Sequence, residues 1–265
     1  MKVLRYLKFC TTLLKFKINR QMAYSFSFWA GFFVDLTVFM IQIGVFKTVF
    51  SQITNLNGWN QYQMIFFVGT FTVLDSLYMC TYFFGVIAIP EKIRTGKLDI
   101  YITKPINTLF FVSFENMDFG SLLLTVPGIL MLVYSSSKLG IILNIGKLSG
   151  YIFLIIIMLI LMYDLMVIIR SSAFWFIKID SLQEFENEMV NFSFRVPGVA
   201  YRGISKLIFF VILPYGLMAT IPTEFFTASL KISLYIMSII ICIVFTVISQ
   251  FAWKFGLRHY GSASS

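Results

Sequence analysis

The feature that most constrains this chain is a series of long apolar runs that charged residues hardly interrupt. The 265 residues are 58% hydrophobic and only 12% charged, whereas a soluble domain carries roughly a quarter charged residues. So few charges cannot cover a surface that faces water. Lipid must therefore surround most of the molecule, and because lipid offers no hydrogen bonds to the backbone, we expect an all-α integral membrane protein.

Five runs are long enough to cross a bilayer as helices, which takes about 20 apolar residues. A sixth segment, 180–227, is harder to interpret. Hydropathy alone selects 206–227 as the remaining span although it contains Pro214 and Pro222, whereas 180–197 is rich in acidic residues. The five clear runs lie near 24–49, 62–88, 108–135, 149–177 and 229–253.

The N-terminal segment, residues 1–22, is expected to be an amphipathic helix that lies in the membrane interface. Its apolar side chains recur at helical spacing, and Arg5, Lys8 and Lys15 lie on the opposite face. A soluble-core helix and a signal peptide are the alternatives, but no uninterrupted apolar core and no small-residue cleavage site follow the first lysines. Residues 23–265 show no repeat, linker or shift in composition, so we expect them to form one transmembrane domain.

The basic residues predict the orientation of the chain. The net charge of +9 does not indicate nucleic acid, because the lysines and arginines lie in short stretches between apolar runs. If the N-terminus is inside, the stretches 1–20, 92–104, 170–178 and 254–258 hold 14 of the 21 basic residues. Such residues favour the cytoplasmic side. We therefore expect both ends in the cytoplasm and an even number of spans. The expected location is the plasma membrane of a bacterial cell.

The familiar patterns of catalysis are absent from the sequence. There is no GxxxxGK[ST] phosphate loop, so the chain is not expected to hydrolyse nucleotide unaided. His259 is the only histidine, which leaves no Ser/His/Asp set, and the three cysteines are far apart without a CxxC pair. We expect no enzyme activity, no metal and no cofactor in this chain.

Acidic residues inside the apolar runs are candidates for a transport path. An aspartate at the centre of the bilayer costs about 2.5–3.5 kcal/mol, which function or pairing usually offsets. Asp35, Asp75 and Asp164 could line a path for cationic or amphipathic cargo. The alternative is a buried pair, or a hydrogen bond to Ser, Thr or Tyr of a neighbouring helix. Glu115 and Asp118 are instead expected near the start of the third span, where acids stabilise a helix N-terminus.

The most informative connection is the loop 90–105 (PEKIRTGKLDIYITKP). It is bounded by prolines and too charged to span the membrane, yet it contains Ile93, Leu98, Ile100 and Ile102. A short helix in this loop could dock on a soluble partner. A solvated connection with interfacial anchors is the alternative.

Four motifs in register, from residue 90 to the C-terminus, resemble those of a branch of the type-2 ABC exporter permeases. Each is short, but together they follow the order and the length of that family. The motifs are 93–99 (IRTGKLD) with 104–106 (KPI), 174–175 (FW), 197–201 (PGVAY) with Pro214 and Pro222 following, and 253–264 (WKFGLRHYGSAS).

The resemblance implies six spans, a cytoplasmic coupling helix between the second and third spans, and a re-entrant outer hairpin at about 204–226. It places the fifth span near 181–197, contrary to hydropathy. The chain departs from the family there, because Glu184, Glu186 and Glu188 make this span unusually acidic. Both interpretations of 180–227 keep the C-terminus inside.

The same resemblance implies the permease subunit of an ATP-driven exporter, for instance in multidrug or peptide efflux. Two separate ABC ATPase subunits would bind ATP and Mg, and a second permease, identical or homologous, would complete the substrate path in the lipid. An ion-coupled secondary transporter, which would often show inverted repeats, and a non-transporting membrane scaffold are the alternatives. The residues implied in ATPase coupling are Glu91, Lys92, Arg94, Thr95, Gly96, Lys97, Leu98 and Asp99.

Overall fold

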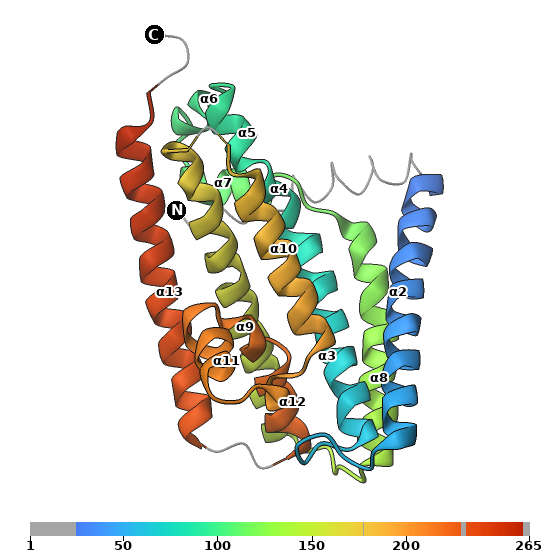
Figure 1. Ribbon diagram of the computed structural model, residues 1–265. Coiled ribbons are helices and arrows are strands. Elements are labelled where there is room, and N and C mark those ends of the chain that lie inside the picture. The colour runs from blue at the N-terminus through green and yellow to red at the C-terminus, as the bar shows by residue number, and fades with distance from the viewer. Residues whose placement is uncertain (1–24, 177, 229–231, 262–265) are drawn as a thin grey trace.

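The computed structural model describes residues 25–176, 178–228 and 232–261, and this part of the chain is helical without a strand. The expected interfacial helix at 1–22 lies outside the described residues. The long helices run roughly side by side along one direction (Figure 1), and shorter helices lie between them. The long helices are α2 (Ser25–Gln52), α3 (Gln61–Tyr78), α8 (Thr125–Lys138), α9 (Ile145–Ser171), α10 (Asp180–Arg195) and α13 (Ile232–His259). The shorter ones are α4 (Phe84–Ile87), α5 (Ile89–Arg94), α6 (Asp99–Ile102), α7 (Thr108–Phe114), α11 (Ile204–Leu207) and α12 (Thr220–Thr227).

Short 3₁₀- and π-helical segments join several of these helices. The π-helix η1 (Met79–Phe83) continues α3 into α4, and the 3₁₀ turn η2 (Phe119–Leu124) leads into α8. The remaining turns are η3 (Ser172–Phe174), η4 (Gly198–Ala200), η5 (Ile208–Ile212) and η6 (Pro214–Leu217).

Four helices among the described residues are long and apolar enough to cross a membrane, or five if one bent pair counts as a span. The expected runs 62–88, 149–177 and 229–253 each correspond to one of them. The first run, 24–49, is helical as α2, of which Leu36–Gln52 qualifies as a shorter apolar helix. The four helices are Gln61–Arg94, Phe119–Lys138, Ile145–Phe174 and Ile232–His259.

The third expected run, 108–135, is not one continuous helix. It begins as α7, leaves helical geometry after Phe114 and resumes at η2. Asp118 begins the second part, where its carboxylate accepts hydrogen bonds from the Gly120 N–H at 3.2 Å and the Ser121 hydroxyl at 2.7 Å. The acid at this position therefore acts as a helix N-cap.

Close contacts between small residues hold α3 against α8. The backbone at Gly69 lies so near the Gly128 carbonyl that a Cβ atom would be 3.0 Å from its oxygen. Without a hydrophobic force between helices in lipid, such small residues let the helices approach and gain van der Waals contact. On the other side of the bundle α9 packs along α13, and the Cys242 thiol lies 3.5 Å from the Ile157 carbonyl.

The segment 206–227, which hydropathy alone selects as the remaining span, is not one straight helix. The helices Ile204–Ile212 and Pro214–Thr227 are bent by 84° relative to each other. The bend lies at Leu213 and Pro214, because proline lacks an N–H and restricts the residue before it. We call residues 204–227 the hairpin.

The two ends of the bundle carry different elements (Figure 1). We call the end with α5, α6 and the C-terminal end of α13 the basic end. The opposite end, with α11, α12 and the connection from α2 to α3, is the hairpin end. The loop 90–105 and the hairpin thus lie far apart along the helices.

Candidate functional site

The loop 90–105 has a defined backbone, and we call it the coupling loop after the role that the resemblance implies. After α5 ends, the Thr95 N–H donates to the Glu91 carbonyl at 2.9 Å and the Leu98 N–H to the Lys92 carbonyl at 3.1 Å. Gly96 turns the chain with φ +72°, a conformation that residues with a Cβ rarely adopt. The chain then enters α6, so the loop contains two short helices joined by a hydrogen-bonded turn.

The apolar residues of the loop divide into an inward and an outward set. Leu98 is fully buried and Ile93 is buried, and both belong to the core of the bundle. Ile100 and Ile102 remain 60% and 44% exposed. Leu98 therefore anchors the loop, and the exposed isoleucines are the apolar residues it offers to a partner.

Lys92 faces inward as well and joins the loop to the helix that follows it. Its ammonium forms an ion pair with the Glu115 carboxylate and lies 4.8 Å from the centre of the Tyr101 ring. The Tyr101 ring contacts Phe111 of α7, with 5.2 Å between ring centres. Lys92 thus connects α5, α6 and the end of α7 and has little surface left for another protein.

Several polar and charged residues of the loop face outward. Glu91, Arg94, Thr95 and Lys97 are exposed. Lys97 and Glu91 lie 3.9 Å apart with 62% of each side chain exposed, and exposed pairs of this kind contribute little to stability. They are free to exchange partners at a docking surface.

Asp99 is half-buried beside the C-terminal segment. Burial and then the neighbouring Asp99 carboxylate raise the pKa of Tyr260 to about 12. Tyr260 is therefore neutral at physiological pH, and its ring lies 6.1 Å from that of Phe174 in η3. The C-terminal segment, η3 and α6 meet at the basic end.

The structure describes two of the three aspartate side chains in the apolar runs, and they differ in their surroundings. Asp164 is buried, and its carboxylate accepts hydrogen bonds at 2.5 Å from the hydroxyls of Thr246 and Ser249 on α13. Asp75 is half-buried and lies beside Tyr78 on its own helix. The side chain of Asp35 lies outside the described residues. The hydrogen bonds of Asp164 join α9 to α13, and a role of these acids along a transport path stays a prediction.

The structure also contains a buried ion pair that sequence reasoning missed. Arg170 in the last turn of α9 pairs with Glu186 of α10, and their side chains are 0% and 2% exposed. From the sequence, Arg170 is expected among the cytoplasmic charges and Glu186 is a departure from the family. The available signal was a charged residue at the end of a long apolar run, which requires a nearby counter-charge.

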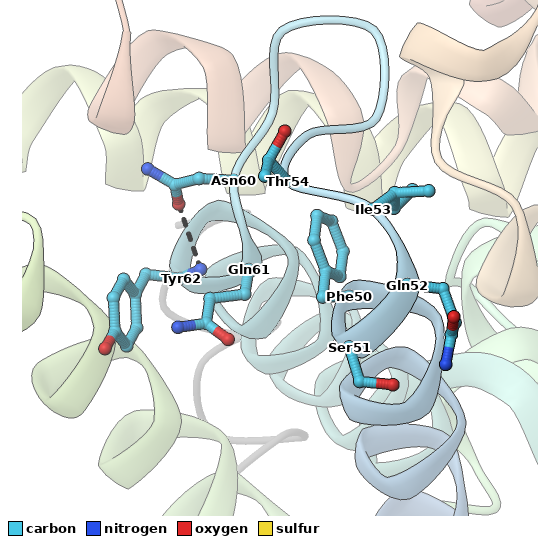
Figure 2. A pocket seen from close by; sticks show the side chains of 8 residues that line it. All are labelled: Phe50, Ser51, Gln52, Ile53, Thr54, Asn60, Gln61 and Tyr62. Atoms are coloured by element: carbon cyan, nitrogen blue, oxygen red, sulfur yellow. Dashed lines mark hydrogen bonds between the residues drawn. The ribbon is translucent and has the colours of Figure 1, made fainter.

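A shallow hollow lies at the hairpin end, where α2 passes into α3 (Figure 2). Its lining comes from one connection, residues 50–62, and includes no charged side chain. Asn60 accepts hydrogen bonds from the N–H groups of Tyr62 and Gln63, at 2.9 and 3.0 Å, and so caps α3. The polar groups here serve local folding and do not converge on a ligand.

The helical bundle and its apolar surfaces define a multi-pass membrane protein. Residues 33–264 match the sequence model of a family described as ABC-2 family transporter protein. The chain belongs to this family, which confirms the resemblance seen in its motifs. Comparison with curated proteins and with solved structures gives no match. The family is one of membrane subunits of ABC transporters and implies ABC ATPase partners in general.

Proposed function

We propose that the chain is the permease subunit of an ABC exporter. In this proposal it forms the substrate path with a second permease, and separate ATPase subunits dock on the coupling loop from the cytoplasm. The single observation that carries the proposal is the construction of this loop, which is anchored inside the bundle and exposes a mixed apolar and charged surface.

The exposed surface suits a protein partner. Ile100 and Ile102 offer apolar area, and Arg94 and Lys97 flank them with charge. Interfaces between proteins typically combine an apolar centre with a polar rim. A loop that only connected two helices would not need to expose large aliphatic side chains beside charges.

The inward contacts of the loop supply a route for force. A push on α5 or α6 reaches the end of α7 through Lys92 and Glu115, and through the ring contact of Tyr101 with Phe111. The Ser113 hydroxyl of α7 in turn lies 3.0 Å from the Tyr163 hydroxyl of α9. Movement of the loop would therefore be carried through the short helix α7 into the long helix α9. Such coupling requires the ATPases to contact the loop differently in their two nucleotide states.

Energy must come from another polypeptide, since the sequence has no phosphate loop. The second permease would pack on apolar helix surfaces that the single chain leaves exposed. On α2 these include Val34, Met40 and Ile41, and on α13 they include Ile243, Val247 and Phe251. Lipid covers whatever part of these surfaces the second permease does not.

Site-specific crosslinking tests the proposal. The chain is expressed in its native host with Ile100→Cys, treated with a thiol-reactive crosslinker, and purified in mild detergent. We expect one ABC ATPase to be crosslinked and to show Mg-dependent ATP hydrolysis. Ile142→Cys is the matched control, because Ile142 is 87% exposed in the connection between α8 and α9 and should give no such product.

Two results would overturn the proposal. One is a purified chain that moves solute without an ATPase, as an ion-coupled transporter would. The other is an ATPase crosslinked equally from positions 100 and 142, which would indicate proximity without a specific docking surface.

A further inference from the structure

The buried ion pair of Arg170 and Glu186 lies where three separate parts of the fold meet. Arg170 comes from the last turn of α9 and Glu186 from the second turn of α10. The third part is the hairpin, whose Tyr215 hydroxyl donates to the other carboxylate oxygen of Glu186 at 3.4 Å. One carboxylate therefore bonds an arginine on one side and a tyrosine on the other.

Tyr215 belongs to η6, directly after the bend of the hairpin. Pro214, Tyr215, Gly216 and Leu217 are all buried, so the bend is packed inside the protein. Gly216 allows this packing, because a Cβ atom would lie 2.9 Å from the Phe209 carbonyl and from the Tyr201 ring. The hydrogen bond of Tyr215 to Glu186 thus lies in the buried bend of the hairpin.

The second leg of the hairpin, α12, is fixed by contacts away from the bend. The Thr220 hydroxyl accepts a hydrogen bond from the Gly198 N–H at 2.8 Å, and the hydroxyls of Thr223 and Thr70 lie 3.4 Å apart. These contacts hold α12 to α3 and to η4. The hydrogen bond from Tyr215 to Glu186 attaches the bend to α10, beside the ring contact of Phe209 with Phe192 at 5.3 Å.

The other attachments of helix α10 lie mainly in its C-terminal half, where Phe192 and Phe194 contact other rings. Of its 16 residues, those with buried side chains are Glu186, Ser193 and Phe194. Ser193 and Phe194 lie in the last turn, where the Gln42 amide donates to the Phe194 carbonyl at 3.3 Å. In its first half α10 is therefore held to the bundle mainly by Arg170.

The Arg170 guanidinium has more N–H donors than the ion pair with Glu186 uses. Its Nε and Nη2 atoms are buried and find no hydrogen-bond partner within the part of the chain that the structure describes. Replacing a buried ion pair with packed apolar residues often leaves stability unchanged or higher. Static attachment alone would not require charges here. A charged group with spare donors can instead exchange one acceptor for another when neighbouring elements move.

We propose that Arg170, Glu186 and Tyr215 form a polar joint that holds the bend of the hairpin closed against α9 and α10. The hairpin opens toward its own end of the bundle when Tyr215 leaves Glu186, and Arg170 keeps Glu186 and α10 in place. The joint is a property of this chain alone and does not depend on the ATPase coupling proposed above.

Thiol labelling in membranes without nucleotide tests the joint. The reporter is Leu217→Cys, a fully buried position two residues after Tyr215, in a chain whose native cysteines are replaced. Labelling by a membrane-impermeant maleimide is followed in vesicles of both orientations. We expect Tyr215→Phe to raise the labelling rate from the hairpin side roughly tenfold, since a hydrogen bond to a charged group typically shifts an equilibrium by that factor.

Tyr201→Phe is the matched control. Tyr201 is also buried, and its hydroxyl donates to the Val196 carbonyl at 3.2 Å, so the variant removes a hydroxyl near the hairpin but outside the joint. Its labelling rate should equal that of the parent. The paired change Arg170→Met with Glu186→Met keeps the interior neutral and should also accelerate labelling, whereas Arg170→Met alone would leave a buried carboxylate unpaired.

The proposal fails if Tyr215→Phe is labelled at the parental rate, or if Tyr201→Phe accelerates labelling as much. Faster labelling from the basic end would also overturn it, because the opening would then have the wrong direction. A monodisperse peak in fluorescence-detected size-exclusion chromatography establishes that each variant is folded.

Discussion

Gly85 of α4 lies against the backbone carbonyl of Ser113 in α7 so closely that no room is left for a Cβ atom. Both neighbours of this contact are backbone, so neither can yield by a change of rotamer. We predict that Gly85→Ala separates α4 from α7 and costs about 2 kcal/mol or more, as overpacking of a tight interior does. Thermal unfolding in detergent measures the effect. Gly44→Ala is the control, because nothing lies within 4 Å of a Cβ at that helical position.

The ion pair of Lys92 and Glu115 gives a second prediction. Glu115→Gln leaves an ammonium in a site where only 11% of the Lys92 side chain is exposed. Because some water reaches the pair, we expect a loss of about 2–3 kcal/mol, below the full cost of breaking a buried pair. Glu91→Gln breaks the exposed contact with Lys97 and should cost less than about 1 kcal/mol. Equal melting temperatures for the two variants would refute the structural role of Lys92.

Much of the fold follows from the positions of apolar residues along the chain. In lipid, a run such as 149–177 must be helical because only a helix satisfies its backbone hydrogen bonds within the segment. Helix α9 begins four residues before and ends six residues before the expected limits. The break in 108–135 could be expected in part from Glu115 and Asp118, since two acids within four residues interrupt an apolar run. Their separate roles, one in an ion pair and one as an N-cap, depend on Lys92 and on local backbone geometry.

The sequence could not reveal which charges are neutralised inside the bundle. Arg170 and Glu186 are separated by a turn, η3, and by the start of another helix, so no helical spacing relates them. Their pairing arises from how α9 and α10 pack. The same limit applies to Leu98 and Ile100, which are equally apolar in the coupling loop, although one is buried and the other exposed. The direction of each side chain is set by the turn at Gly96.

The turn at Gly96 leads to a prediction about coupling. Proline holds φ near −65° and cannot adopt the φ of +72° found here, so Gly96→Pro should misdirect α6 while α5 and the spans remain intact. Leu98→Asp should have a similar effect by placing a carboxylate in a fully buried position. We expect both variants to insert and to retain an ATPase whose hydrolysis no longer drives transport. Gly140→Pro, at a comparable φ of +63° but at the other end of the bundle, should leave coupling intact.

The ratio of transport to ATP hydrolysis in membrane vesicles measures this coupling. Full transport by both Gly96→Pro and Leu98→Asp would remove the loop from the mechanism. Loss of transport in Gly140→Pro as well would indicate a general effect of proline on the fold.

Variants of Asp164 can distinguish a structural role of this residue from a role in transport. Its two oxygens accept hydrogen bonds from Thr246 and Ser249, one helical turn apart on α13. Asp164→Asn keeps one acceptor and removes the charge, whereas Asp164→Leu removes both acceptors and leaves the hydroxyls of half-buried Thr246 and buried Ser249 to find other partners. We predict that the leucine variant is less stable than the asparagine variant by about 1–3 kcal/mol, the usual cost of unsatisfied buried groups.

Thermal unfolding measures this difference, and efflux of a cationic dye from cells measures transport. An asparagine variant with parental stability but without dye efflux would assign the charge itself to the path, whereas parental efflux would limit Asp164 to joining α9 and α13.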